Sequence, residues 1–309
     1  MINVVVLGGS GMLGSMVTDV LSRDPELTIK ATVRSKEYLS PFSLKIPNVE
    51  WVYLDVEYPN RDKIQKNLGN ANWVINAIGL TKPYTHDDKP KEIERAIRIN
   101  AILPYELSHA ASSIGAQILQ IATDCVYDGV LGKYIENSPH NPLDVYGKTK
   151  SLGEALLPNY HCFRCSIIGP EPKAFVFLLE WFRRQPDDAQ INGFINHQWN
   201  GVTTLHFAKL CLASVKNNLD LPNIQHIVPT GSISKYDLLT CFAKDYHRED
   251  IDIKPTEANT VIDRTLATAN ETLNRQLWSF AGYPDPPTVP QMVTEMAQFN
   301  FRSEGIENK

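Results

Sequence analysis

The sequence has few cysteines, no long apolar run and no excess of basic residues. Five cysteines are spread over 309 residues without framework spacing, which favours a reducing, cytoplasmic setting. No uncharged apolar stretch reaches about 18 residues, so we expect no membrane span. The formal charge of −5 gives no electrostatic reason to expect nucleic acid or an anionic membrane surface as a partner. The first residues also lack the basic leader of a signal peptide.

Metal-site spacing is absent as well. Cys162 and Cys165 form a Cys-x-x-Cys pair, but it lies in a strand-like run, where residues three apart face opposite sides of a sheet. No second pair completes a zinc site. The eight histidines include no spacing such as His-Glu-x-x-His. We therefore expect structural cysteines and no metal centre.

The first half of the chain alternates strand and helix patterns. Strands are predicted at residues 3–7, 28–33, 49–54, 73–77, 117–122 and 162–168. Helices are predicted at residues 12–22, 61–68, 92–114 with an interruption at Pro104, and 146–157. Short apolar runs separated by helices are typical of βαβ units and of a parallel sheet buried on both faces. The expected fold is therefore α/β, with a Rossmann-type doubly wound parallel sheet.

The regular alternation of strand and helix patterns ends after about Gly169. Residues 175–184 and 204–217 look helical, residues 192–201 are polar, and short strands and helices then mix with many prolines. We predict a Rossmann domain over residues 1–169, rejoined by about 202–228. Residues 170–201 and 229–309 are expected to form a smaller C-terminal α/β lobe that binds substrate.

A glycine-rich turn follows the first predicted strand and opens the first helix. It runs Gly8-Gly9-Ser10-Gly11-Met12-Leu13-Gly14. Gly8 permits a tight turn, Gly11 lets the backbone approach a pyrophosphate, and Gly14 allows close packing of helix on strand. The helix N-terminus adds free N–H groups and a positive dipole end. This context predicts a dinucleotide site. Its expected contacts are Gly8, Ser10, Gly11, Met12 and Leu13.

The end of the second predicted strand bears on the choice of cofactor. An acidic residue there would hydrogen-bond the ribose 2′-hydroxyl of NAD. The chain instead has Arg34, with Lys36 nearby, and a cation suits the 2′-phosphate of NADP. We favour NADP(H) over NAD(H). The alternative is a solvated charge beyond the end of a strand.

Tyr146 and Lys150 are four residues apart in a predicted helix, so both side chains share one face. Free tyrosine has a pKa near ~10 and is a poor acid-base catalyst at neutral pH. A cation one turn away favours the phenolate, so we expect Lys150 to lower the pKa of Tyr146. Together with the glycine turn, the pair becomes a candidate for proton transfer.

With both features, the sequence resembles the extended branch of the short-chain dehydrogenase/reductase superfamily. The segment from Thr123 to Gly129, Pro142 and the Tyr146–Lys150 run are similar to the RmlD-like dTDP-4-dehydrorhamnose reductases. The resemblance covers most of residues 1–210 and is faint beyond. Val202 stands where that family usually has proline, and Cys125 where it usually has an aromatic residue. These departures leave the identity of the sugar open.

The resemblance implies further site residues. Beside the cofactor it places Asp55, Val56, Ala77, Ile78, Gly79, Asn100, Tyr146, Lys150 and Ile167. In a later loop, Gln198 and Trp199 either line a nucleotide-sugar pocket or belong to the core.

The resemblance also implies roles in catalysis. Lys150 would hydrogen-bond the nicotinamide ribose, and Thr123 would hydrogen-bond the substrate carbonyl oxygen. Tyr146 would protonate that oxygen while NADPH delivers hydride to its carbon. Asp124 either takes a direct part in the chemistry or caps its loop.

Three functions fit the resemblance. The first is NADPH-dependent reduction of a 4-keto nucleotide sugar, which supplies a deoxysugar for a surface polysaccharide. The second is an epimerase or dehydratase on the same scaffold. The third is a non-catalytic NADP-binding regulatory subunit, like the reductase-like regulators of methionine adenosyltransferase. The joint presence of Thr123, Tyr146 and Lys150 argues against the third, and we favour the first of the two enzymatic functions. By analogy with the family, a homodimer through the helices near 92–114 and 146–157 is also expected.

Overall fold

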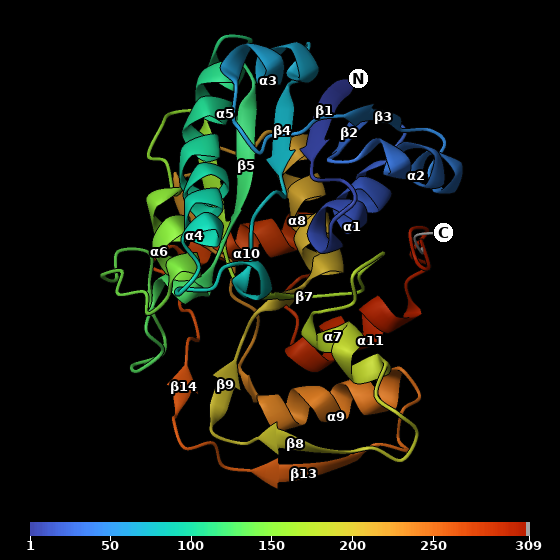
Figure 1. The fold of residues 1–309 in the computed structure, drawn as a ribbon, viewed down its shortest axis with the longest axis vertical. Coiled ribbons are helices and arrows are strands. Elements are labelled where there is room, and N and C mark those ends of the chain that lie inside the picture. The colour runs from blue at the N-terminus through green and yellow to red at the C-terminus, as the bar shows by residue number, and fades with distance from the viewer. Residues whose placement is uncertain (307–309) are drawn as a thin grey trace.

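The computed structural model describes residues 1–306 and contains a seven-stranded sheet with the order β11-β6-β5-β4-β1-β2-β3 (Figure 1). Each pair of neighbouring strands in it is parallel. The strands are β1 (Ile2–Leu7), β2 (Leu27–Val33), β3 (Glu50–Tyr53), β4 (Trp73–Asn76), β5 (Gln117–Ala122), β6 (Tyr160–Arg164) and β11 (Ile224–His226). This sheet confirms the predicted Rossmann-type α/β fold. The chain order reverses between β1 and β4, which makes that point the switch point of the sheet.

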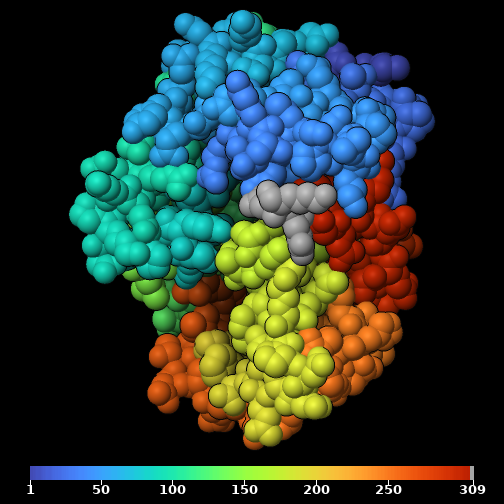
Figure 2. All heavy atoms as spheres, turned by 45° about the vertical axis from the view of Figure 1, so that its right-hand side comes forward, coloured from blue at the N-terminus to red at the C-terminus, as the bar shows by residue number. Residues whose placement is uncertain are grey.

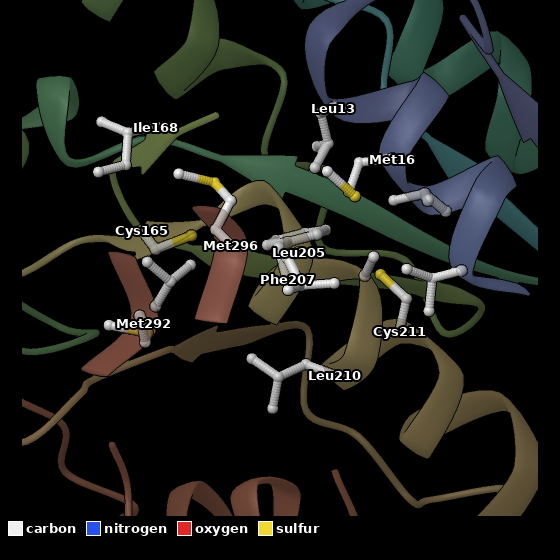
Figure 3. Packing of buried hydrophobic residues seen from close by; sticks show 14 of the residues in the cluster. Leu13, Met16, Cys165, Ile168, Leu205, Phe207, Leu210, Cys211, Met292 and Met296 are labelled. Atoms are coloured by element: carbon white, nitrogen blue, oxygen red, sulfur yellow. The ribbon is translucent and has the colours of Figure 1, made fainter. Parts of the chain in front are cut away.

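Helices cover both faces of this sheet. On one face, α1 (Met12–Leu21) packs against α8 (Thr204–Asn217); on the other, α3 (Arg61–Leu68) packs against α5 (Leu103–Ser112). The alternation of side chains along β1 explains this: Val4 and Val6 belong to one buried cluster, and Val5 and Leu7 belong to the other. Figure 3 shows part of the first cluster, with side chains from α1, α8 and the C-terminal helix α11 (Val289–Gln298).

The two cysteines of the Cys-x-x-Cys pair are divided between these clusters. Cys165 is buried with α1 and α8, whereas Cys162 is buried with α3 and α5. All five cysteines lie in the described part of the chain and are free thiols. The pair therefore fills the core on two faces, as the strand pattern predicts.

The predicted helix 92–114 is divided in three. It comprises α4 (Pro90–Ala96), a π-helical turn (Ile97–Ile102) and α5. The break precedes Pro104, because proline has no N–H to donate to the carbonyl of Asn100 four residues earlier. The helix predicted at 146–157 is also shorter: α6 is Val145–Leu152 and ends at Gly153.

The smaller lobe lies below the sheet in the view of Figure 1. Its strands pair as a three-stranded sheet, β12-β9-β14, and a two-stranded sheet, β13-β8. These strands are β8 (Gln190–Phe194), β9 (His197–Trp199), β12 (Ile233–Ser234), β13 (Asp252–Thr256) and β14 (Ile262–Asp263). The remaining α-helices within residues 1–306 are α2 (Leu39–Lys45), α7 (Leu178–Arg183), α9 (Lys235–Asp245) and α10 (Glu271–Phe280).

Three sequence-based expectations need correction. The strand predicted at 162–168 is β6 followed by a separate β7 (Ile167–Ile168), which leaves the main sheet to pair with β10 (Val202–Thr203). The helix predicted at 175–184 begins only at Leu178, because Ala174 and Phe175 have left-handed φ angles of 72° and 54°. The helix α2 was not predicted.

The division of the chain into domains stays a prediction. The structure shows that residues 204–217 return to the first face of the main sheet as α8, and that residues 224–226 form its edge strand beside β6. Across residues 1–306, no helix is long and apolar enough to cross a membrane. The same residues contain no group of three or more His, Cys, Asp or Glu side chains placed to hold a metal ion.

Candidate active site

A cavity of about 570 Å³ opens at the carboxyl ends of the strands, where the strand order reverses. Its volume lies within the usual range for small-molecule sites, about 300–1,000 Å³. The crevice outside the carboxyl ends at a switch point is where open α/β sheets bind ligands. Of the predicted cofactor-binding and catalytic residues, all except Asn100 line it: Gly8, Ser10, Gly11, Met12, Leu13, Arg34, Asp55, Val56, Ala77, Ile78, Gly79, Thr123, Asp124, Tyr146, Lys150 and Ile167.

Asn100 lies behind the wall of the cavity, on the π-helical turn. Its side chain is buried, and its amide exchanges two hydrogen bonds of 2.9 Å with the backbone of Leu80. Its Nδ2 also donates to Thr149 Oγ1 (3.1 Å) on α6. These bonds occupy the side chain that was expected to contact the cofactor. Asn100 instead holds the loop after β4 and the helix α6 in place.

The glycine turn forms a cradle at the N-terminus of α1. Gly8 has φ of +79°, which suits glycine, and a Cβ on Gly14 would lie 2.1 Å from the carbonyl oxygen of Gly8. A Cβ on Gly11 would approach that oxygen only to 3.4 Å, so the space beside Gly11 is open. No side chain among residues 1–306 caps the helix N-terminus. The free N–H groups and open cradle fit the pyrophosphate of a nicotinamide dinucleotide.

The helix α6 brings Tyr146 to the other end of the cavity. Asp144 caps the helix by accepting from the N–H of Gly147 (2.8 Å), and Lys82 Nζ holds Asp144 Oδ2 at 2.8 Å. A Cβ on Gly147 would lie 2.3 Å from the carbonyl oxygen of Cys125. Only glycine therefore lets α6 pack this closely on the turn after β5, which carries Thr123.

The largest influence on the pKa of Tyr146 is its burial, and not the charge of Lys150. Burial raises the pKa of Tyr146, Cys125 adds to the rise, and a hydrogen bond with Thr123 opposes it. Lys150 Nζ donates to the carbonyl oxygen of Ile121 (2.8 Å), and burial lowers the pKa of Lys150. In this structure the Tyr146 pKa is raised and not lowered, and Lys150 is not among the groups that shift it, so the expected effect of Lys150 stays a prediction.

Thr123 organises the turn that follows β5. Its Oγ1 accepts from the N–H of Cys125 (3.2 Å) and donates to Asp124 Oδ1 (3.3 Å). Thr123, and not Asp124, therefore caps the turn. Burial raises the pKa of Asp124, against the charges of Arg264 and Lys235. Burial also raises the pKa of Cys125 to about 11, so this thiol stays protonated.

Several cations near this cavity were not predicted. Lys82, Arg95 and Lys173 line it, Lys173 from the loop after β7. Lys235 begins α9, and burial lowers its pKa to about 8 while the charges of Asp124 and Cys125 raise it. None of these residues belongs to a motif that the sequence analysis used for the site. Trp199 is buried, donates from Nε1 to Ser166 Oγ (2.8 Å), and is not part of the cavity wall, which places it in the core.

Comparison with known proteins gives the family. Residues 2–299 match the family model described as the RmlD substrate binding domain. The chain belongs to this family. Membership confirms the resemblance to dTDP-4-dehydrorhamnose reductases that the motifs indicated.

Relatives of this RmlD-family chain differ in how much of it they match. The dTDP-4-dehydrorhamnose reductase of Salmonella typhimurium is 25% identical over 97% of this chain and 92% of that protein. The reductase of the same name from Mycolicibacterium smegmatis is 24% identical over 60% of this chain and 47% of that protein. Methionine adenosyltransferase 2 subunit beta of Xenopus tropicalis is 34% identical, but over only 28% of this chain and 25% of that protein.

Two solved structures share the fold over nearly the whole RmlD-family chain. The dTDP-4-dehydrorhamnose reductase of Bacillus anthracis, in complex with NADP, has a TM-score of 0.73 at 20% identity and covers 96% of this chain and 99% of its own. The UDP-glucuronic acid 4-epimerase of Bacillus cereus, in complex with UDP-glucuronic acid and NAD, has a TM-score of 0.75 at 14% identity and covers 96% of this chain and 98% of its own. At such identities the likeness concerns the fold.

Proposed function

We propose that this protein reduces the keto group of a 4-keto nucleotide sugar with hydride from NADPH, as a dTDP-4-dehydrorhamnose reductase does. One observation carries the proposal. One cavity is lined both by the glycine turn, through Gly8, Ser10, Gly11, Met12 and Leu13, and by the hydroxyl-bearing residues Thr123 and Tyr146. Membership in the RmlD family and the reductases that match nearly the whole chain support the same reaction.

The residues at the hydroxyl end have separate roles in this proposal. When bound, NADPH supplies the hydride. Thr123 and Tyr146 hold the carbonyl oxygen of the substrate, and Tyr146 donates its proton to that oxygen as the carbon is reduced to an alcohol. Tyr146 carries this proton at neutral pH, as an unperturbed tyrosine with a pKa near ~10 also does, and burial raises its pKa further. Lys150, tied to Ile121 by one of its three donors, has two left for the cofactor ribose.

Asp124 has a supporting role in this scheme. Its carboxyl group accepts from the Thr123 hydroxyl, which orients that hydroxyl beside Tyr146. Direct proton transfer by Asp124, as in the dehydratase alternative, remains a second use of the same side chain. The raised pKa of Asp124 is compatible with either use.

NADP(H) is proposed over NAD(H) because of the charge at the adenosine end. Arg34 follows β2 on the cavity wall, where an NAD-specific site would carry an acid. The change Arg34→Asp is expected to weaken NADPH binding and to leave NADH binding equal or stronger. Titration of both cofactors with both proteins measures this, and an unchanged preference would remove the argument.

One assay separates the three functions. NADPH absorbance is followed with a panel of nucleotide-linked 4-keto sugars while product is measured separately. Stoichiometric oxidation of NADPH supports the reductase, and product without oxidation supports the epimerase or dehydratase. Binding of cofactor and sugar without product supports a regulatory subunit, the function named for the Xenopus relative that matches a short part of the chain.

Location and assembly complete the proposal. We place the protein in the cytoplasm, where its five free thiols would stay reduced. We also propose a homodimer through the exposed apolar side chains around the π-helical turn and α6, which include Ile97, Ile102, Leu152 and Leu156. Sedimentation of the purified protein tests the dimer, and a monomer at micromolar concentration would contradict it.

A further inference from the structure

We propose that Lys173, in the loop that enters the smaller lobe, is a second cation for the adenosine 2′-phosphate and acts from the wall of the cavity opposite Arg34. The inference rests on the proposed use of NADPH and names a further residue that selects it. It also makes the smaller lobe part of the cofactor site.

The position of the ammonium group is the first observation. Lys173 Nζ donates to Ser10 Oγ (3.1 Å) in the glycine turn and lies 3.4 Å from the centroid of the Tyr38 ring. Lys173, Ser10 and Arg34 all line the same cavity. In the face shown in Figure 2, yellow-green residues of the smaller lobe lie below the blue residues of the N-terminal part of the chain. The side chain therefore bridges the two walls of the cavity.

The charge around this group is the second observation. Over residues 1–306, neither Arg34 nor Lys173 forms a salt bridge with a carboxylate. The pKa of Lys173 is lowered to about 8, first by burial and then by the charge of Arg34, while Glu37 has a smaller opposing effect. Two cations that disfavour each other in a partly buried cleft are stabilised by a shared anion.

The loop holds Lys173 in this place from both sides. On its N-terminal side, the buried Glu171 accepts from the N–H of Phe177 (2.7 Å). Next to Lys173, Ala174 and Phe175 are left-handed, and the Phe175 ring lies 3.4 Å from the Arg184 guanidinium carbon. Non-glycine residues are strained in this conformation, so contacts around the loop must maintain it. The fold thus directs the ammonium group into the cavity and away from solvent.

Two rival explanations have to be separated from this proposal. In the first, Arg34 alone binds the 2′-phosphate; in the second, Lys173 binds the pyrophosphate. If Arg34 alone reads the 2′-phosphate, Lys173 is a surface lysine that happens to touch Ser10. If Lys173 binds the pyrophosphate, which NAD and NADP share, its removal weakens both cofactors equally. A 2′-phosphate contact weakens NADP alone, so a comparison of the two cofactors separates these cases.

The test measures affinity by calorimetry, with NADP⁺, NAD⁺, 2′,5′-ADP and 5′-AMP as probes. Lys173→Met is compared with Lys66→Met, which removes the same charge from an exposed residue of α3 that does not line the cavity. We expect Lys173→Met to weaken NADP⁺ and 2′,5′-ADP by about 10- to 100-fold and the other two probes by less than about 3-fold. Lys66→Met should change none by more than about 3-fold, and Lys173→Arg should retain most of the affinity.

Two outcomes overturn the proposal. Equal losses for NADP⁺ and NAD⁺ would assign Lys173 to the pyrophosphate. Losses no larger than those of Lys66→Met would show that Lys173 contributes only its long-range charge and no contact with the phosphate. Because the readout is binding, it does not depend on turnover. A protein that binds NADP⁺ as expected but oxidises no NADPH would contradict the proposed reaction and leave the role of Lys173 intact.

Discussion

Tyr146 offers a test of the chemistry at a single oxygen atom. Replacing it with phenylalanine keeps the ring on the cavity wall and removes the proton that the carbonyl oxygen receives. Loss of a positioned general acid costs about 10²- to 10⁴-fold in rate. We expect kcat to fall by that factor while the affinity for NADP⁺ changes by less than about twofold. Steady-state assays and calorimetry measure the two quantities.

The control for this change is Tyr58→Phe. Tyr58 is 73% exposed and lies under the Arg98 guanidinium, a contact that phenylalanine keeps. This variant should match the wild type in both measurements. Near-normal turnover in Tyr146→Phe would exclude the phenol as the proton donor.

Lys173 predicts a pH dependence for cofactor binding. Its pKa is about 8 in the free protein, and a bound phosphate dianion favours the charged form, so binding raises that pKa. Affinity for NADP⁺ is then full below pH 8 and falls as the pH rises above it, by up to tenfold per unit. A phosphate monoester has a second pKa near ~6 and is already dianionic in this range. The groups that face Lys173 are Arg34, Glu37 and Tyr38.

The measurement is NADP⁺ affinity between pH 7 and pH 9. Lys173→Arg should remove the dependence, because arginine keeps its charge throughout. NAD⁺ affinity, which lacks the 2′-phosphate contact, should stay nearly flat in both proteins. A wild-type NADP⁺ profile that is flat across pH 8 would show that the ammonium group of Lys173 does not hold the phosphate.

At the scale of single residues, the local motifs correctly predicted that their own residues line the cavity. The glycine turn, Arg34 and the Tyr146/Lys150 pair all line the cavity, because each sits at the end of a strand or the start of a helix. The four-residue spacing of Tyr146 and Lys150 gives no information on how deeply Tyr146 is buried. Because burial is the largest influence on the Tyr146 pKa, the pKa is raised and not lowered. Lys173 and Lys235 reach the site only through the tertiary fold.

Among the elements, α6 depends on a close approach that only glycine allows. A Cβ on Gly153 would lie 1.9 Å from the backbone oxygen of Asn100 in the π-helical turn. Because a backbone carbonyl cannot rotate away as a side chain does, Gly153→Ala must separate α6 from that turn. We expect a loss of about 3 kcal/mol in the free energy of unfolding, the upper part of the range for overpacking.

Urea unfolding of Gly153→Ala and of Lys148→Ala compares the two effects. Lys148 is exposed on the same helix, so its replacement should change stability by less than about 0.5 kcal/mol. Turnover should also fall in Gly153→Ala alone, since Tyr146 and Lys150 move with the helix. A Gly153→Ala protein as stable as Lys148→Ala would mean that the two elements are not held in this contact.

The elements also show where sequence patterns stop being informative. The helix α8 was predicted with its observed bounds, because Thr203 caps it at one end and its apolar face is continuous. The π-helical turn was not predicted: Pro104 signalled a break, but its place depends on how α6 and the loop after β4 pack around Asn100. The short strands of the smaller lobe, two to five residues long, carry too little pattern to be recognised.

In the whole molecule, the last part of the described chain returns to the first helix. Asp19 on α1 is buried, and Arg302 donates to it from the backbone N–H (2.7 Å) and from Nε (2.7 Å). Arg302 also reaches the Asp19 carbonyl oxygen (2.8 Å) and Ser22 Oγ (2.6 Å). Arg23 Nε adds a bond of 2.8 Å to Asp19. These hydrogen bonds hold the segment that follows α11 against the C-terminal end of α1.

The change Arg302→Met tests this connection across the whole fold. It leaves the buried carboxylate of Asp19 with Arg23 as its remaining cation, and loss of one partner from a buried ion pair costs about 3–5 kcal/mol. We expect about 3 kcal/mol, the lower end, because Arg23 stays. Arg275→Met is the matched control, since Arg275 and its partner Asp285 are 68% and 82% exposed and such pairs contribute little. Adding Asp19→Asn to Arg302→Met should recover part of the loss, because a neutral amide is cheaper to bury than an unpaired charge. If Arg302→Met unfolds at the same urea concentration as Arg275→Met, the contact does not join the two ends of the molecule.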